Sequence, residues 1–151
     1  MRINTKFPVA IHIMAVTYII GEEYSTSDKL ARSVDTNPVV IRRINAMLKK
    51  ANLITVKSGV GGTALNREPK DITLLEIYNA VKSSSDERLF DMHSSSNLNC
   101  VVAVNIQEAL SEPLLSAQKA MEEELDRYTL ADVLDKIPAI SAAELDRQRK
   151  G

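Results

Sequence analysis

The sequence has one cysteine, Cys100, among 151 residues, and it has no tryptophan. A single thiol allows no disulfide within the chain and no cysteine-rich zinc module, and it is typical of a protein from a reducing compartment. Aromatic residues make up only 4% of the chain, which argues against an aromatic stacking platform for single-stranded nucleic acid. We therefore expect a cytoplasmic protein, and we predict no metal and no cofactor.

Long hydrophobic runs are also absent. The most apolar stretch, residues 8–20, is interrupted by His12 and Thr17 and lacks the small-residue cleavage pattern of a signal peptide. It is shorter than the ~20 apolar residues that cross a bilayer. Its apolar residues recur at helical spacing, which predicts a buried core helix.

Catalytic patterns are missing too, since the chain shows no Ser-His-Asp arrangement, paired-carboxylate cleft or cofactor fingerprint, and we predict no enzyme. What is present is a charge asymmetry. Residues 1–70 carry 11 Lys and Arg against 5 Asp and Glu, whereas residues 71–151 carry 8 against 15. A basic first half indicates a polyanionic partner, although a chance partition of solvated charge would look the same.

Periodicity, caps and turn residues predict a mostly α-helical fold with one small β-hairpin. The predicted helices cover residues 4–20, 28–34, 38–51, 74–82, 104–127 and 130–134, and the strands cover 53–57 and 63–66. Pro113 should kink or split the long helix. We divide the chain into a winged helix-turn-helix region (1–82), a sensor loop and dimerisation helix (83–135) and a C-terminal tail (136–151), for which we predict a frayed helix from about residue 137.

The helix predicted over residues 38–51 is amphipathic. One arc is apolar, with Val40, Ile41, Ile44, Met47, Leu48 and Ala51, while the opposite arc carries four cations and no carboxylate. Arginine can bind guanine, lysine can neutralise phosphate, and a β-branched residue can meet a thymine methyl, so this arc suits the DNA major groove. A solvated basic face is the alternative.

The short helix before this amphipathic helix and the glycine-rich hairpin after it favour a helix-turn-helix with a wing. A nucleotide-phosphate loop is a poorer interpretation of these glycines, because no Lys-Ser/Thr follows them. The predicted DNA-binding residues are Thr26, Ser27, Asn37, Pro38, Val39, Arg42, Arg43, Lys49, Lys50, Lys57, Ser58, Gly59, Gly61 and Gly62.

Several segments together resemble the Rrf2-type bacterial transcription regulators, the group of IscR, NsrR and CymR. They are Asn4–Phe7, Thr36–Ile44, Leu48–Ala51, Gly59–Gly62, Ile72–Ile77 and Thr129–Asp132, and the resemblance is greatest to the YwnA-like members that lack a cluster. The resemblance implies a winged helix-turn-helix homodimer on an imperfectly palindromic double-stranded operator. Many members carry an arginine just before the wing glycines, where this chain has Ser58. Members that bind an iron–sulfur cluster carry three cysteines before the long helix, where this chain has only Cys100, so we expect no such cluster.

In the family, the long helix crosses its twin. The apolar stripe of the predicted helix agrees with this, although it could instead pack within one subunit. The predicted dimer-interface residues are Ile106, Leu110, Leu114, Ala117, Met121 and Leu125.

Cys100 stands at the start of this helix, where a thiol can become reactive, and it is a candidate redox sensor; a buried, inert thiol is the alternative. A metal site of Asp91, His93 and Cys100 has loose spacing, and a solvated loop histidine is favoured. The sequence thus leaves two functions open. The first is a DNA-binding repressor released by oxidants, electrophiles or a small effector. The second is an adaptor whose acidic half docks a metabolic enzyme.

Overall fold

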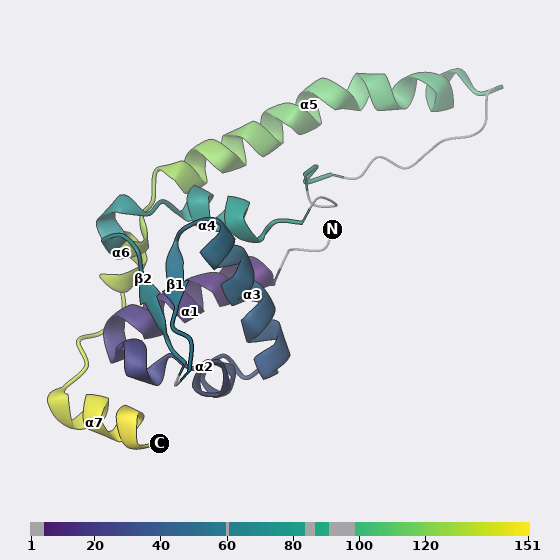
Figure 1. Ribbon diagram of the computed structural model, residues 1–151. Coiled ribbons are helices and arrows are strands. Elements are labelled where there is room, and N and C mark those ends of the chain that lie inside the picture. The colour runs from purple at the N-terminus through teal and green to yellow at the C-terminus, as the bar shows by residue number, and fades with distance from the viewer. Residues whose placement is uncertain (1–4, 60, 84–86, 91–98) are drawn as a thin grey trace.

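The computed structural model describes residues 5–59, 61–83, 87–90 and 99–151, and its elements are mainly helical (Figure 1). This confirms the predicted fold class. None of the helices in these ranges combines the length and apolar character that a membrane span requires. In chain order the elements are α1 (Lys6–Ile20), η1 (Glu22–Tyr24), α2 (Ser27–Val34), α3 (Pro38–Lys50), β1 (Ile54–Val56), β2 (Thr63–Leu65), η2 (Pro69–Asp71), α4 (Leu74–Val81), α5 (Val101–Asp126), α6 (Leu130–Leu134) and α7 (Ala142–Lys150).

Helix α1 lies at the centre of the core. Ala10, Ile13 and Met14 are fully buried, and α1 contacts α2, α3, α4 and β2. Its apolar character extends around most of its surface, as expected for a helix that neighbours cover on several sides. A buried hydrogen bond of 2.7 Å joins the hydroxyls of Thr17 and Thr63, and it fixes the end of α1 against the hairpin.

Helices α2 and α3 form the helix-turn-helix. The Thr26 side chain caps α2, and Asp35 ends it in the left-handed conformation with φ 58°. Asn37 caps α3 by accepting a hydrogen bond from Val39 N at 2.8 Å, and Pro38 takes the first helical position, where its missing N–H costs nothing. These predicted boundaries are therefore confirmed to within one residue.

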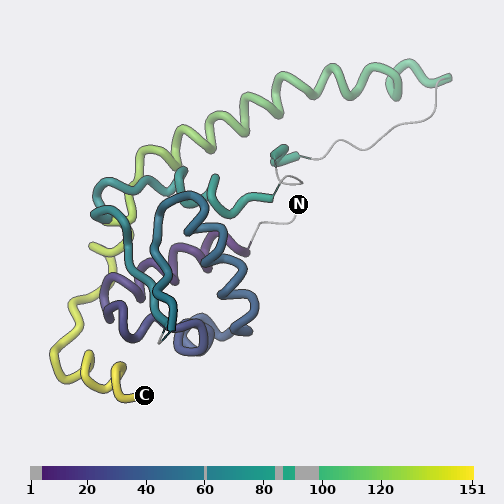
Figure 2. The backbone as a smooth tube through the Cα atoms, viewed as in Figure 1, coloured from purple at the N-terminus to yellow at the C-terminus, as the bar shows by residue number. Residues whose placement is uncertain are grey.

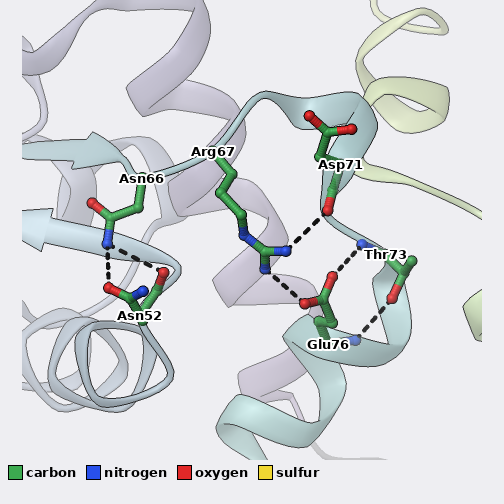
Figure 3. A network of polar contacts seen from close by, with 6 residues as sticks. All are labelled: Asn52, Asn66, Arg67, Asp71, Thr73 and Glu76. Carbon is green, nitrogen blue, oxygen red and sulfur yellow. Dashed lines mark hydrogen bonds and ion pairs between the residues drawn. The ribbon is translucent and has the colours of Figure 1, made fainter.

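Strands β1 and β2 form the wing as an antiparallel pair, shorter than predicted. Asn66, just after β2, donates from Nδ2 to the backbone oxygen and Oδ1 of Asn52, at 3.2 and 3.0 Å, and so closes the base of the hairpin (Figure 3). The pairs in register are Ile54 with Leu65, Thr55 with Ala64 and Val56 with Thr63.

Arg67 connects the wing to α4. Its guanidinium donates to Glu76 at 2.7 Å and to the backbone oxygen of Asp71 at 3.1 Å (Figure 3). Glu76 also belongs to the capping box with Thr73 that opens α4. Burial alone would raise the pKa of Glu76, but the backbone N–H of Thr73 and the Arg67 guanidinium together hold it below its usual value.

Helix α5 leaves the body at a short junction with the start of α4. Leu130 N donates to the oxygen of Ile72 at 2.8 Å, and Leu74 N donates to the oxygen of Tyr128 at 2.9 Å. Ile72 and Leu130 are both fully buried. The opposite end of α5 extends away from the other elements (Figure 2).

The second half of the chain differs from the predictions in its details. Helix α5 begins at Val101, three residues earlier than predicted, because the Sγ atom of Cys100 accepts a hydrogen bond from Ala103 N and caps the helix. Pro113 does not split it, since a solvent-exposed helix leaves the freed carbonyl open to water. The tail does contain a helix, α7, and the capping box of Ser141 and Glu144 opens it.

Candidate nucleic-acid interface

The outward side of α3 is the predicted reading face, defined here as Val39, Arg42, Arg43, Lys49 and Lys50. All five side chains are exposed, Val39 to 47%, while the opposite side of the helix is fixed in the core by Ile41, Ile44 and Leu48. None of the ion pairs between described residues involves a cation of this face. Four positive charges therefore face solvent without a neutralising carboxylate.

Two residues assigned to the apolar arc are placed differently. Val40 is 36% exposed and Ala51 is exposed, so the buried side of α3 is narrower than predicted. Both lie at the ends of the helix, where the body no longer covers it. Val40 follows Val39 directly, and the two side chains present apolar surface beside the N-terminus of α3.

The predicted residues at the N-termini of α2 and α3 have capping roles. Thr26 Oγ1 accepts from Lys29 N at 3.4 Å, and the Oδ1 atom of Asn37 is taken by Val39 N. Thr26 and Ser27 are half-buried, whereas Asn37 is exposed. These side chains set where the two helices begin. At the start of α3, Pro38 has no N–H, Val39 N donates to Asn37 Oδ1, and Val40 N and Ile41 N donate to the backbone oxygen of Asn37.

The wing glycines fall into two kinds. Gly59 is exposed, and a Cβ atom there would meet nothing within 4 Å, so this backbone can approach a ligand closely. Gly62 was predicted to touch DNA, but it is buried: a Cβ atom there would stand 2.5 Å from the backbone oxygen of Glu22. With φ +109°, Gly62 lets the wing lie directly against η1. Gly61 lies between these extremes, half-buried against the side chain of Thr26.

The wing lysine is already paired in the free protein. Lys57 Nζ lies 2.5 Å from Glu22 Oε2, and the hydrogen bond and charge of Glu22 raise the pKa of Lys57. The predicted phosphate contact of Lys57 therefore competes with this carboxylate. No sequence pattern indicates this pairing, because Glu22 and Lys57 lie far apart in the chain. Ser58, beside Lys57, is exposed.

The predicted dimer stripe lies along α5, none of whose residues is buried. Its C-terminal half packs on α4 and on residues 87–90, where Gln118 donates to the Glu87 oxygen at 2.9 Å. Leu110 stays 39% exposed and Ala117 is exposed, and the half-buried members of the stripe are Ile106, Leu114, Met121 and Leu125. The body thus leaves much of the apolar surface of α5 open to water.

Cys100 is half-buried, and its Sγ atom lies 3.5 Å from Ala103 N. Asp91 and His93, weighed with Cys100 as metal ligands, lie outside the described residues. Within the described ranges, no three His, Cys, Asp or Glu side chains are grouped as a metal site would require. One cysteine in the whole sequence cannot supply the three thiolates of a cluster site.

The chain is similar to known transcription regulators over most of its length. Residues 3–136 match the Rrf2 family, described as "Iron-dependent Transcriptional regulator". The HTH-type transcriptional regulator YwnA of Bacillus subtilis (strain 168) is 44% identical over 135 residues, which cover 89% of this chain and 98% of that protein. A crystal structure described as that of a DNA-binding protein is 41% identical, with a TM-score of 0.69 over 86% of this chain and 99% of its own.

The structure of CymR from B. subtilis, the global cysteine regulator, shares the fold at 20% identity. Its TM-score is 0.62, over 91% of this chain and 99% of that one. The family description names iron, but the single cysteine of this chain cannot hold an iron–sulfur cluster through three thiolates. Family and relatives are transcriptional regulators and not enzymes. The chain belongs to the Rrf2 family of transcriptional regulators.

Proposed function

We propose that this protein is a cytoplasmic, homodimeric repressor that binds an imperfectly palindromic DNA operator through α3 and the wing. The observation that carries the proposal is the reading face, whose four cations face solvent without an ion pair at the end of a rigid helix-turn-helix. Arg42 and Arg43 lie one helical turn from the α3 N-terminus, where recognition helices contact base edges. Lys49 and Lys50, at the far end, would neutralise phosphates.

The recognition step can be tested with Arg42→Ala and Arg43→Ala. Each should weaken operator binding by about 5- to 150-fold, because a bidentate arginine–guanine contact contributes ~1–3 kcal/mol of discrimination. Fluorescence anisotropy at several salt concentrations measures both affinity and salt slope. Lys136→Ala removes an exposed cation outside the face and serves as the control. If both arginine variants bound like wild type, α3 would not be the recognition helix.

A substitution next to the wing should strengthen operator binding, in contrast to the arginine variants of α3. Glu22→Gln should tighten operator binding several-fold at low salt, because it frees Lys57 for a phosphate and removes a negative charge beside the DNA. The slope of log K against log salt should become more negative by about 0.9 if Lys57 then makes one new phosphate contact.

Glu23→Gln is the matched control for this variant, because it removes the same charge from η1 but no bond to Lys57. If the two substitutions tightened operator binding equally, the loss of one negative charge would explain the effect of Glu22→Gln without the release of Lys57. Weaker binding by Glu22→Gln would mean that the ion pair holds the wing in its binding position.

Dimerisation is assigned to α5, since this helix of 26 residues has no buried residue within one subunit. A helix of this length is stabilised mainly by covering its apolar face. A twin helix would cover the stripe and place two copies of α3 on one side of the duplex, about one helical turn apart.

Leu110→Glu should convert the dimer to a monomer in sedimentation experiments at micromolar concentration, because it would bury a charge in the interface. Leu115→Glu is the matched control: Leu115 is 58% exposed and lies on another side of the helix. A monomeric wild type, or loss of the dimer in the control alone, would contradict the assignment. Capture of a foreign protein by α5 in place of its twin would favour an adaptor.

The signal that releases DNA is an oxidant or electrophile acting at Cys100, or a small effector. Modification of the half-buried thiol would change the group that caps α5 and so the first turn of the dimer helix. A gel shift with hydrogen peroxide should release wild-type protein from the operator and leave Cys100→Ser bound. The same response in both proteins would exclude Cys100 as the sensor.

A further inference from the structure

Helix α7 lies outside residues 3–136, which match the family. It is nevertheless docked on the helix-turn-helix. The Nε and Nη2 atoms of Arg149 both donate to the oxygen of Ile20, at 3.3 and 3.2 Å, and the guanidinium lies 5.3 Å from the centre of the Tyr24 ring. Arg32 of α2 donates to the oxygen of Gly151 at 3.2 Å. Figure 1 shows α7 below the other elements, near α2.

Between α7 and the body lies a cavity of about 300 Å³, which we name the α7 pocket. That volume is at the lower limit of small-molecule sites, and it suits a ligand the size of one substituted ring. The pocket is lined by Val16 and Ile20 of α1, Tyr24 of η1, Lys29, Arg32 and Ser33 of α2, Arg147 and Gln148 of α7, and Gly151.

The charged side chains of this pocket are all cationic: Lys29, Arg32 and Arg147 line it, and no Asp or Glu does. Arg32 already donates to the oxygen of Gly151, whereas none of the ion pairs between described residues includes Lys29 or Arg147. Lys29 Nζ lies 4.5 Å from the centre of the Tyr24 ring, a cation–π contact that leaves its charge uncancelled. Lys29 and Arg147 have no carboxylate partner among the described side chains, so an anion bound beside them would be stabilised.

The apolar wall decides which anion fits. Val16, Ile20 and Tyr24 are half-buried and supply aliphatic and aromatic surface to the same pocket. Inorganic phosphate or a DNA phosphodiester would use only the cations, whereas a carboxylate on a flat apolar body would use both walls. Arginine also offers a planar fork that matches a carboxylate.

We propose that the α7 pocket binds a small aromatic carboxylate, and that its occupancy changes operator affinity. The binding of the carboxylate is independent of the proposed function, whereas its effect on operator affinity rests on that function. The route to the DNA is short, because the ligand would touch η1 and α2 together. Glu22 of η1 holds Lys57 and abuts Gly62, and Thr26 at the start of α2 contacts Gly61. A ligand that prefers one arrangement of these elements would shift operator affinity by that preference.

The binding half is tested without DNA, by calorimetric titration of the full chain with benzoate. We expect saturable binding with a Kd of about 1 mM or tighter, since a nine-atom ligand rarely exceeds this range by far. Benzyl alcohol, which lacks the charge, and acetate, which lacks the ring, should each bind at least ~10-fold more weakly, because each uses one wall only. Equal binding of all three probes, or no saturation by benzoate, would overturn the site.

The location is tested with Arg147→Gln, which removes an exposed cation of the pocket wall and should weaken benzoate binding at least ~10-fold. Lys150→Gln is the matched control, since Lys150 is an exposed cation of the same helix outside the pocket lining. Equal losses in both variants would show general attraction to a basic surface and overturn the assignment. Weaker operator binding by Arg147→Gln, with no benzoate binding in wild type, would assign this surface to DNA phosphate instead.

The coupling is tested by measuring operator affinity with and without saturating benzoate. A change in wild type that disappears in Arg147→Gln supports regulation through the pocket. Unchanged affinity while benzoate is bound overturns the regulatory half. Failure of the protein to bind any operator would contradict the proposed function, but the calorimetric result on the pocket would stand.

Discussion

The junction between residues 72–74 and 128–130 fixes the long helix to the helix-turn-helix. Two backbone hydrogen bonds of 2.8 and 2.9 Å join the segments, and Ile72 and Leu130 are fully buried beneath them. Thr73 and Thr129 cap the helices that leave the junction, α4 and α6. Since α5 ends just before this junction, any rotation of α5 against a partner must either carry α4 with it or break these contacts. In the proposed dimer, the junction would thus transmit the arrangement of the two subunits to the DNA-binding elements.

The wing is held at both of its ends. At its root, Arg67 binds Glu76 of α4, and Asn66 binds Asn52 beside β1. At the other end, Gly62 lies against the backbone of Glu22. Between these two anchors, Ser58 and Gly59 are exposed to solvent. A wing held in this way loses little conformational freedom on meeting a DNA backbone, so less of its contact energy is spent on ordering.

The sequence could predict those features whose causes are local. A helix cap needs only neighbours within four residues, and the caps at Asn37, Thr73 and Thr129 were all recognisable. The cationic arc of α3 follows from helical periodicity alone. In contrast, the Lys57–Glu22 pair, the buried position of Gly62 and the docking of Arg149 on Ile20 each join distant parts of the chain. No periodicity or motif reports such contacts, because they exist only once α1, η1 and the hairpin have packed together. The sulfur cap of Cys100 was missed for another reason: cysteine is not among the usual capping residues.

Two separate routes reach the DNA-binding surface, and both meet at the wing. From α5, the path runs through the junction to α4 and then through Glu76 and Arg67 to the wing root. From α7, it runs through Tyr24 and η1 to Glu22, which contacts both Lys57 and Gly62. The reading face of α3, by comparison, is backed by fully buried side chains and has little room to move. A signal from either end of the chain would therefore change operator affinity more readily through the placement and charge of the wing than through α3. Such a change would depend on the Glu22–Lys57 ion pair, because breaking it frees the Lys57 ammonium of the wing to contact a DNA phosphate.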